Sequence, residues 1–312
     1  MILTLTLNPA IDRNVMVDRL VFEDRAYILS TSESAGGRGI NASCVIHSFG
    51  GRTLAITVSG GPSGARLEKY LAGCGFPAEI VPIANEVRNN LTITDKQGLT
   101  VKLNEIGPYV SAAELDRLEA GVRARLPETK WLMICGSVPP GVPPNFYSKL
   151  LTAAREHGVK TLLDTDGESL VEGLAAGPTA VAPNQQEAER LLSTALLTRT
   201  HFREAASKIR GMGAEAVVLS LGSRGAVGAF QGHLWEAIPP RVDAVCPIGA
   251  GDALAAAFVW AMHEKNDFAE ALRWGVAAGT ASAHLPGLRF ASLEQTRALY
   301  AQVEVRPAGQ GA

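Results

Sequence analysis

Residues 247–252, with the sequence PIGAGD, combine residue types that could act on an anion. Gly249 and Gly251 let a ligand approach the backbone, and the apolar run 253–262 that follows predicts a buried helix. A helix beginning here would direct free N–H groups and its positive dipole end at the anion. Asp252 would repel a phosphate there unless it accepts a proton from the attacking hydroxyl. These residues alone leave two interpretations open, a catalytic base or an ordinary acidic residue in a first helical turn.

Composition and charge exclude several classes of function. The 312 residues are 46% hydrophobic and 19% charged, which is typical of a globular chain with a large core. The formal net charge of −2 argues against a general nucleic-acid binder. The four cysteines lie far apart without a CxxC pair, so neither a disulfide framework nor a zinc site is indicated. No apolar run reaches the ~18 residues of a membrane span, and the first residues resemble a strand rather than a signal peptide. We therefore expect a cytoplasmic protein with a small-molecule partner and no nucleic-acid or membrane partner.

Strand-like and helix-like segments alternate along most of the chain. The strands are expected at 53–58, 131–135, 160–164, 179–182 and 216–219, and the helices at 42–49, 65–71, 146–156, 168–174, 185–192 and 202–212. This alternation predicts an α/β protein whose mostly parallel sheet is covered by helices on both faces, with ligands at the carboxyl ends of its strands. We expect one domain over residues 1–312, with a frayed tail at 307–312.

One region breaks the alternation. Segments 90–94 and 99–103 alternate polar and apolar residues around a turn at 95–98, which indicates a β-hairpin, and 15–20 is typical of another short strand. These pieces predict a small antiparallel sheet apart from the main body. This sheet would be either a lid over an active site or an insertion without a functional role. The exposed face of such a sheet could also pair with a second subunit.

Four motifs in a fixed order make the chain similar to the PfkB-type, ribokinase-like carbohydrate kinases over nearly its whole length. GGRGIN at 36–41 and GAGD at 249–252 are the main signatures, with NQQE at 184–187 and SLGSRG at 220–225 between them. The opening TLNPAID at 6–12 resembles the phosphosugar branch, which comprises 1-phosphofructokinase, tagatose-6-phosphate kinase and the minor 6-phosphofructokinase. This resemblance implies a three-layer α/β body with a mostly parallel sheet and a small β-sheet lid.

The resemblance also assigns roles to individual residues. Asp252 would be the catalytic base, and the amides of Gly249, Ala250 and Gly251 would form an anion hole for the moving phosphoryl group. Glu187 would order magnesium and its waters. The residues implied for the sugar substrate are Asp12, Gly37, Arg38, Gly39, Asn41, Arg88, Asn90 and Ser137. Those implied for the nucleotide are Asn184, Ser220, Gly222, Gly225, Val276 and Thr280.

The implied activity is that of an ATP- and Mg²⁺-dependent kinase. Its substrate would be a ketohexose phosphate, namely fructose 1-phosphate, fructose 6-phosphate or tagatose 6-phosphate, and Arg38 and Arg88 would hold the phosphate already present. The lid, from segments near 13–35 and 88–105, would join two copies into a homodimer.

Three departures from the family's pattern keep other interpretations open. Arg38 and Ala182 stand where lysine is frequent, and Pro247 replaces a common threonine. One alternative is a kinase for an unphosphorylated sugar or nucleoside, and another is a phosphosugar-binding protein with weak or lost catalysis. A third alternative, a nicotinamide-dependent oxidoreductase, depends on a loose glycine fingerprint that starts at Gly37 and lacks its usual later acidic residue.

Overall fold

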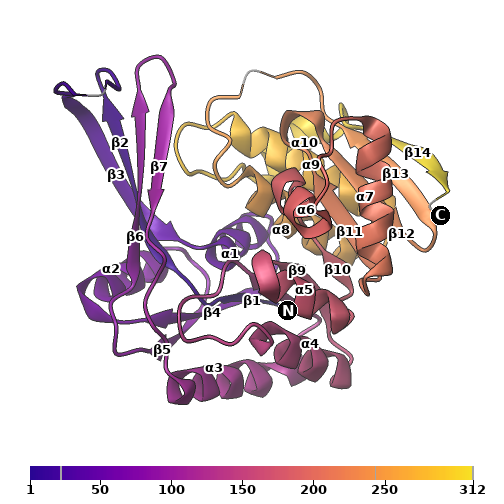
Figure 1. Cartoon of the computed structure of the whole chain (residues 1–312), viewed down its shortest axis with the longest axis horizontal. Coiled ribbons are helices and arrows are strands. Elements are labelled where there is room, and N and C mark those ends of the chain that lie inside the picture. Colours follow the sequence, from indigo (N-terminus) through magenta and orange to yellow (C-terminus); the bar gives the residue numbers. More distant parts are fainter. Residues whose placement is uncertain (22, 243, 311–312) are drawn as a thin grey trace.

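In the computed structural model, which describes residues 1–21, 23–242 and 244–310, ten strands form a main sheet (Figure 1). From edge to edge they are β14 (Glu304–Gln310), β13 (His233–Ile238), β12 (Ala226–Phe230), β11 (Ala216–Ser220), β10 (Ala180–Val181), β9 (Lys160–Asp164), β8 (Trp131–Cys135), β1 (Ile2–Thr6), β4 (Thr53–Ser59) and β5 (Ala78–Pro82). The seven strands from β11 to β5 are parallel, and the other three extend the sheet antiparallel. The predicted mostly parallel sheet is confirmed.

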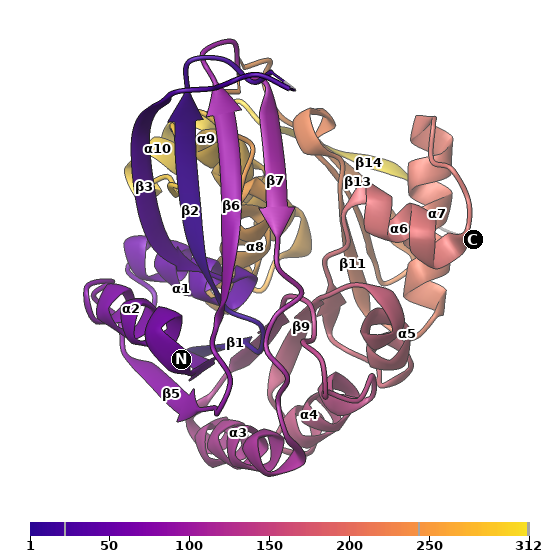
Figure 2. The same cartoon turned by 60° about the vertical axis from the view of Figure 1, so that its left-hand side comes forward.

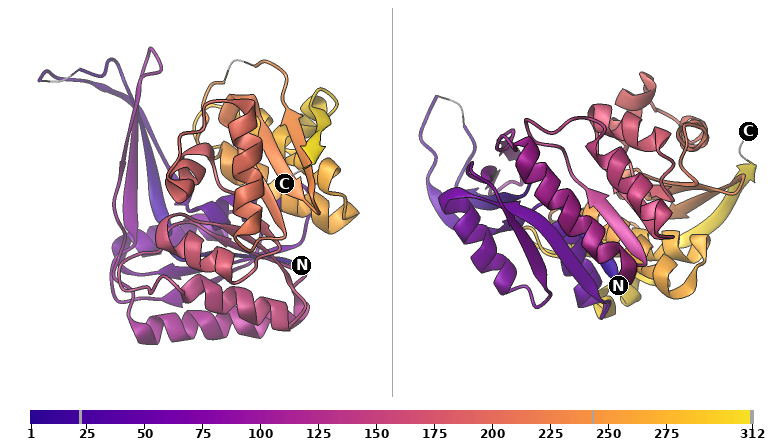
Figure 3. Two further views of the ribbon diagram at one scale, coloured as in Figure 1. Left: turned by 45° about the vertical axis from the view of Figure 1, so that its right-hand side comes forward. Right: turned by 90° about the horizontal axis from the view of Figure 1, so that it is seen from below.

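Helices cover both faces of the main sheet (Figure 3). They are α1 (Arg38–Ser48), α2 (Gly61–Ala72), α3 (Ala112–Arg125), α4 (Phe146–Glu156), α5 (Gly167–Ala175), α6 (Gln185–Leu192), α7 (Arg199–Gly211), α8 (Ala250–Lys265), α9 (Phe268–Ala283) and α10 (Leu293–Tyr300), with 3₁₀ turns η1 (Leu126–Glu128) and η2 (Gly222–Arg224). Alternate strand residues enter opposite cores: Leu3 and Leu5 pack in the core that includes α3, α4 and α7, whereas Ile2 packs with α1, α8 and α9. No helix in these residues is long and apolar enough to cross a membrane.

Four strands form a second, small sheet that projects from the body above α1 and α2 (Figure 2). Its order is β3 (Ile28–Gly36), β2 (Ala10–Val17), β6 (Arg88–Asp95) and β7 (Thr100–Asn104). The pairs β2–β3 and β6–β7 are antiparallel as expected, whereas β2 and β6 run parallel. The hairpin predicted around the turn at 95–98 is present.

The strand expected at 15–20 is displaced in the structure. β2 begins earlier, at Ala10, and ends at Val17. It stops there because the Asp18 carboxylate accepts hydrogen bonds from the backbone N–H groups of Arg19 at 2.9 Å and Tyr27 at 2.7 Å. These bonds turn the chain toward β3, which the sequence pattern did not indicate.

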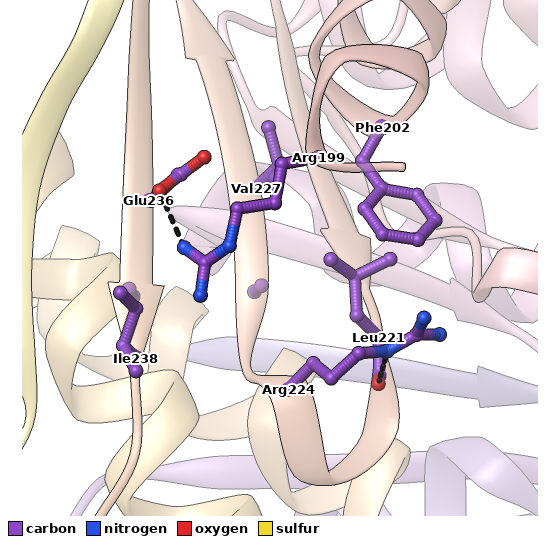
Figure 4. Close-up of a pocket in the computed structure, with 9 residues that line it drawn as sticks. Arg199, Phe202, Leu221, Arg224, Val227, Glu236 and Ile238 are labelled. Carbon is purple, nitrogen blue, oxygen red and sulfur yellow. Dashed lines mark hydrogen bonds and ion pairs between the residues drawn. The ribbon is translucent and has the colours of Figure 1, made fainter. Parts of the chain in front are cut away.

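The expectation of a frayed tail at 307–312 is wrong for its described part, because β14 pairs with β13 up to Gln310; residues 311 and 312 lie outside the described residues. Buried Glu236 on β13 accepts hydrogen bonds from Arg306 of β14 at 2.9 Å and from Arg199 and Arg203 of α7 at 3.0 and 2.9 Å. Burial by itself would raise the pKa of Glu236, but the bonds from Arg306 and Arg203 outweigh it and hold that pKa below its usual value. This cluster borders a cavity of about 50 Å³, in which Arg199 reaches Glu236 (Figure 4). Edge strand β14 is therefore held to the body by an ion pair between Arg306 and Glu236 as well as by backbone pairing with β13.

Candidate active site

The candidate site lies at the carboxyl edge of the main sheet. The parallel register places Thr6 of β1 beside Cys135 of β8, and Cys135 beside Asp164 of β9. The loops that leave these strands therefore emerge side by side. The first turns of α1 and α8 meet close to the same edge, because Asn41 of α1 hydrogen-bonds Asp252 of α8. This is the edge at which parallel α/β sheets bind ligands.

Asp252, the predicted base, lies half-buried in the first turn of α8. Its Oδ2 accepts a hydrogen bond of 2.6 Å from Asn41 Nδ2. Burial raises the pKa of Asp252 to about 7 and the nearby Asp164 charge adds to the rise, whereas Arg38 and the Asn41 bond oppose it. A carboxylate with this pKa can accept a proton near neutral pH, as general base catalysis requires.

The glycine-rich loop before Asp252 leaves amide groups free for an anion. Gly249 adopts a left-handed conformation, with φ 77°, that starts α8 at Ala250. The Ala250 N–H donates to the Pro247 carbonyl at 3.2 Å, so this member of the predicted anion hole is already engaged. Gly251 is exposed, and a Cβ placed on it would meet no atom of the described residues within 4 Å, so the space beside its Cα is open. The N–H groups of Gly251 and Asp252 lack intrahelical acceptors because they belong to the first turn.

Asp12 and Asn90 form a hydrogen-bonded pair on neighbouring strands of the small sheet. They are cross-strand partners on β2 and β6, and Asn90 Nδ2 donates to Asp12 Oδ1 at 2.8 Å. Burial raises the pKa of Asp12, while Asn90 and Arg88 oppose the rise. A Cβ at Gly36 would lie 2.1 Å from Asp12 Oδ2, so only glycine leaves room for this carboxylate. A carboxylate held in this way can accept hydrogen bonds from hydroxyl groups.

The glycines at the start of α1 have a structural reason of their own. Gly37 has φ 128°, and a Cβ there would lie 2.5 Å from the Thr6 side chain. A Cβ on Gly39 would lie 2.6 Å from the Leu5 carbonyl oxygen. Both residues thus let α1 pack directly on β1, and their contact with a sugar stays a prediction. Asn41, also predicted to bind the sugar, donates a hydrogen bond to Asp252, and its contact with the sugar stays a prediction.

Arg88 is a partly buried guanidinium that protein groups satisfy incompletely. Its Nη1 and Nη2 donate to the carbonyl oxygens of Glu105 and Asn8, both at 3.0 Å. Its Nε is buried without an acceptor, and among the described residues no carboxylate forms a salt bridge with it. Burial lowers the pKa of Arg88 and the Arg38 charge adds to this effect, whereas Asp12 and Glu105 oppose it. An incoming anion would supply the missing acceptor.

Ser137 lies close to Arg88 through Asn8. Asn8 Nδ2 donates to Ser137 Oγ at 3.2 Å and to the Ile106 carbonyl at 2.9 Å, and its backbone carbonyl is the one that Arg88 binds. Its buried Oδ1 has no hydrogen-bond partner within the described part of the chain. Sequence reasoning did not single out Asn8, although it stands within the TLNPAID segment quoted for the resemblance.

Arg38 is paired with carboxylates of the protein, and its predicted contact with the substrate phosphate stays a prediction. Its Nη1 is 2.8 Å from Asp164 Oδ1, and its Nη2 is 3.0 Å from Glu187 Oε1 and 3.7 Å from Asp166 Oδ2. These carboxylates raise its pKa, Asp164 most strongly. Asp164 and Asp166 were missed because their only signal in the sequence is their position at the end of a strand.

The residues predicted for the nucleotide form the start of α6 and the turn after β11. Asn184 caps α6 and exchanges hydrogen bonds of 2.9 Å with Glu187 in a capping box. Asn184 also bridges to Ser220, and Gly222 and Gly225 have φ of 61° and 90° in the following turn. These features bring the residues together, and their nucleotide contacts stay predictions.

Two further residues predicted for the nucleotide lie on α9. Val276 is buried in the core, and its carbonyl accepts a hydrogen bond of 2.7 Å from the Thr280 hydroxyl. Helices α9 and α8 approach closely here, because a Cβ on Gly279 would lie 2.8 Å from the Ala250 carbonyl oxygen. Thr280 is half-buried and is therefore the more accessible of the two. Their contact with adenine stays a prediction.

The carboxylates around Arg38 suit magnesium only in part. No group of three metal-ligating side chains occurs in the described residues. Both oxygens of buried Glu187 are already engaged, Oε1 by Arg38 and Oε2 by the Asn184 N–H, so Glu187 does not fit as a direct ligand. Asp166 is 40% exposed and borders a hollow of about 560 Å³ that also reaches Glu187. These oxygens fit a magnesium ion that is held mainly by phosphates and waters, with Asp166 and Glu187 beside its water shell.

The site therefore combines a carboxylate of near-neutral pKa with free amides at a helix start, a hydroxyl-binding pair and an incompletely satisfied arginine. No Walker motif occurs in the sequence. These features define the class of α/β phosphotransferases that hold phosphate at a helix start without a Walker motif.

Comparison with known proteins identifies the family within this class. Residues 5–296 match the pfkB family carbohydrate kinases. The chain is 32% identical over 303 residues to ATP-dependent 6-phosphofructokinase isozyme 2 of Escherichia coli (strain K12), covering 96% of this chain and 98% of that protein. It is 28% identical over 308 residues to tagatose-6-phosphate kinase of Staphylococcus epidermidis, covering 98% and 99%. The tetrameric inhibited form of phosphofructokinase-2 from Escherichia coli matches with a TM-score of 0.89 at 32% identity, covering 96% and 98%. The chain belongs to the pfkB family of carbohydrate kinases.

Proposed function

We propose that this protein transfers the γ-phosphoryl group of ATP to a hydroxymethyl group of a ketohexose monophosphate, giving a bisphosphate. The observation that carries the substrate class is Arg88, whose partly buried guanidinium keeps an unpaired Nε and has no salt bridge among the described residues. A phosphate dianion satisfies such a group with charge-assisted hydrogen bonds, whereas a neutral sugar leaves it poorly compensated. Two relatives are named 6-phosphofructokinase and tagatose-6-phosphate kinase, and these names agree with this choice.

The proposed mechanism is in-line phosphoryl transfer. Arg88 and Ser137 bind the substrate's phosphate, and Asp12, oriented by Asn90, accepts hydrogen bonds from the sugar hydroxyls. Asp252 accepts the proton of the attacking hydroxyl as its oxygen bonds to the γ-phosphorus and the bond to ADP breaks. The Gly251 and Asp252 amides, at the positive end of α8, stabilise the charge on the moving phosphoryl group.

Asp166 and Glu187 would lie beside the water shell of a magnesium ion bound with the nucleotide, and this ion would neutralise phosphate charge. Arg38 adds a fixed positive charge among these carboxylates, so that they can lie close to one another. Ser220, Gly222, Gly225, Val276 and Thr280 are proposed to line the rest of the nucleotide.

The small sheet is proposed to act as a lid and to join two copies of the chain. Leu91 pairs with Leu103 and Ile93 with Val101, so these apolar side chains share one face, and Leu103 is 53% exposed. A second lid would cover this face and make a symmetric dimer. Light scattering at micromolar concentration tests the idea: a dimeric mass supports it and a monomeric mass contradicts it, while a tetramer would match the form described for the Escherichia coli protein.

The substrate class is tested by ADP release across a panel of sugars and sugar phosphates. We expect strong preference for fructose 6-phosphate, tagatose 6-phosphate or fructose 1-phosphate over free fructose, tagatose, ribose and nucleosides. Efficient use of a free sugar or nucleoside alone would establish the rival kinase, and binding without turnover would indicate a phosphosugar-binding protein.

The role of Asp252 is tested separately. Asp252→Asn should retain nucleotide binding and lose about 10²–10⁴-fold in kcat, which is the usual contribution of a positioned base. A folded variant with unchanged kcat would remove Asp252 from the chemistry.

A further inference from the structure

Two cysteines meet where α1 packs against the segment that follows α2, away from the candidate active site. Cys44 precedes His47 by three residues on α1, so both occupy one helix face. His47 faces that segment, because a Cβ on Gly75 would lie 2.8 Å from His47 Nε2 and the His47 ring packs edge-on against Phe76 with centroids 5.9 Å apart. Cys74 lies within the same short segment.

The two thiols lie beside each other. Cys74 Sγ donates to the Tyr70 carbonyl oxygen at 3.3 Å, and the Cys44 and Cys74 side chains are close enough for each to be the main influence on the other's pKa. Both residues are half-buried, so small oxidants can reach the pair from solvent. The chain separates them by thirty positions, which is why their spacing alone indicated no disulfide.

The neighbouring Cys44 side chain makes Cys74 the more acidic thiol. It lowers the pKa of Cys74 to about 7, against the opposing effect of burial, and the pKa of Cys44 is raised in return. The C-terminal end of α2, which precedes Cys74, would disfavour a thiolate, so the acidity comes from the partner thiol rather than from the helix. Cys135 is buried, and burial raises the pKa of its thiol, which makes it unreactive by comparison.

We propose that Cys44 and Cys74 form a reversible intramolecular disulfide when the protein meets a peroxide. The Cys74 thiolate attacks one peroxide oxygen, the O–O bond breaks and Cys74 becomes a sulfenic acid, with the other oxygen leaving as water after protonation. The Cys44 sulfur then attacks the Cys74 sulfur, the S–O bond breaks, and the Cys44 proton leaves with the hydroxide as a second water. The sum is two thiols and one hydrogen peroxide giving one disulfide and two waters, and a dithiol reductant restores the thiols.

The bond would connect two elements on which the candidate site depends. Asn41, which binds Asp252, lies one turn before Cys44 on α1, and α2 packs against β2 and β3 of the small sheet. A disulfide between α1 and the end of α2 would therefore connect the helix that carries Asn41 to the helix that packs against the small sheet. The inference does not depend on the proposed function, because its chemistry and its readout concern the thiols alone.

Mass spectrometry of the full chain treated with hydrogen peroxide tests the proposal. We expect the loss of two hydrogen atoms, two thiols remaining of the four, a tryptic peptide that links Cys44 to Cys74, and reversal by dithiothreitol. Cys246→Ser, which removes another half-buried thiol, should give the same cross-link, whereas Cys74→Ser should abolish it. In Cys44→Ser, oxidation should stop at Cys74 as a sulfenic acid that dimedone traps.

Three outcomes would overturn the proposal: four free thiols after treatment, a cross-link that joins another pair, or dimedone labelling of Cys44 rather than Cys74. The wild-type measurement needs no substitution, so the result stands even where a variant folds poorly.

Discussion

The hydrogen bond from Asn41 to Asp252 gives a quantitative prediction for the pH dependence of activity. The bond is short, 2.6 Å, and it stabilises the ionised carboxylate. Hydrogen bonds to a charged group contribute about 1.5–3 kcal/mol, and 1.36 kcal/mol corresponds to a tenfold change in acidity. Removing the bond with Asn41→Ala should therefore move the acid limb of the pH profile upward by about one to two pH units from its position near 7.

The sign follows from the role of a base. Asp252 acts only when it is ionised, so activity falls as the pH decreases through its pKa. A variant in which this pKa is higher therefore loses activity at a higher pH. Near pH 7 about half of the wild-type carboxyl is ionised, against about 1–10% in the variant. The kcat/KM at pH 7 should thus fall about 5- to 50-fold and recover above pH 9.

The assay is coupled ADP release with a ketohexose phosphate from pH 5.5 to about 9.5, read as kcat/KM because that ratio reports the free enzyme. Asn90→Ala is the matched control, since it deletes an equivalent bond of 2.8 Å to Asp12 rather than to Asp252. It should raise the KM for the sugar and leave the acid limb in place. An unmoved limb in Asn41→Ala, or an equal displacement in both variants, would refute the assignment of Asp252 as the titrating base.

Three other substitutions test separate parts of the structure. Arg88→Met should raise the KM for the sugar phosphate about 10- to 150-fold, with a smaller change for ATP, as steady-state kinetics would show. Glu187→Gln should raise the Mg²⁺ concentration for half-maximal activity in a magnesium titration, and an unchanged requirement would place Glu187 outside the metal's surroundings. Glu236→Gln should lower the free energy of unfolding by about 2–4 kcal/mol at pH 7, as measured by urea titration. Folding lowers the pKa of Glu236, so the ionised carboxylate stabilises the wild type above that pKa. The difference in unfolding free energy between wild type and variant should therefore vanish as the pH falls through the folded-state pKa.

Local features of the sequence sufficed to locate most elements of the main body. The helices expected at 146–156 and 185–192 and the strand at 160–164 coincide with α4, α6 and β9. Periodicity and capping act over a few residues, so each segment carries its own signal. The same holds for GAGD at 249–252, where the glycines, the start of α8 and Asp252 are adjacent in the chain. The resemblance to carbohydrate kinases rests on such local motifs, and family membership confirmed it.

The partner of each functional side chain was decided by the tertiary structure. Asn41 is 211 positions from Asp252, and Arg38 is 126 positions from Asp164. A sequence shows that Arg38 carries charge, but not that carboxylates already lie against it, so its assignment to the substrate stays a prediction. Arg88 has the same charge and lies in another segment, yet its nearest acceptors are carbonyl oxygens. Only this difference in surroundings separates the two arginines.

The sequence by itself determined the local elements, the glycine-rich helix start with its carboxylate and the family. The tertiary structure decided that β14 pairs along the sheet edge, that Glu236 forms ion pairs with three arginines, and that Cys44 lies beside Cys74. The physical reason is range: backbone periodicity and capping involve neighbours a few residues apart, whereas ion pairs, pKa values and thiol contacts depend on distances that only the folded packing of remote segments sets.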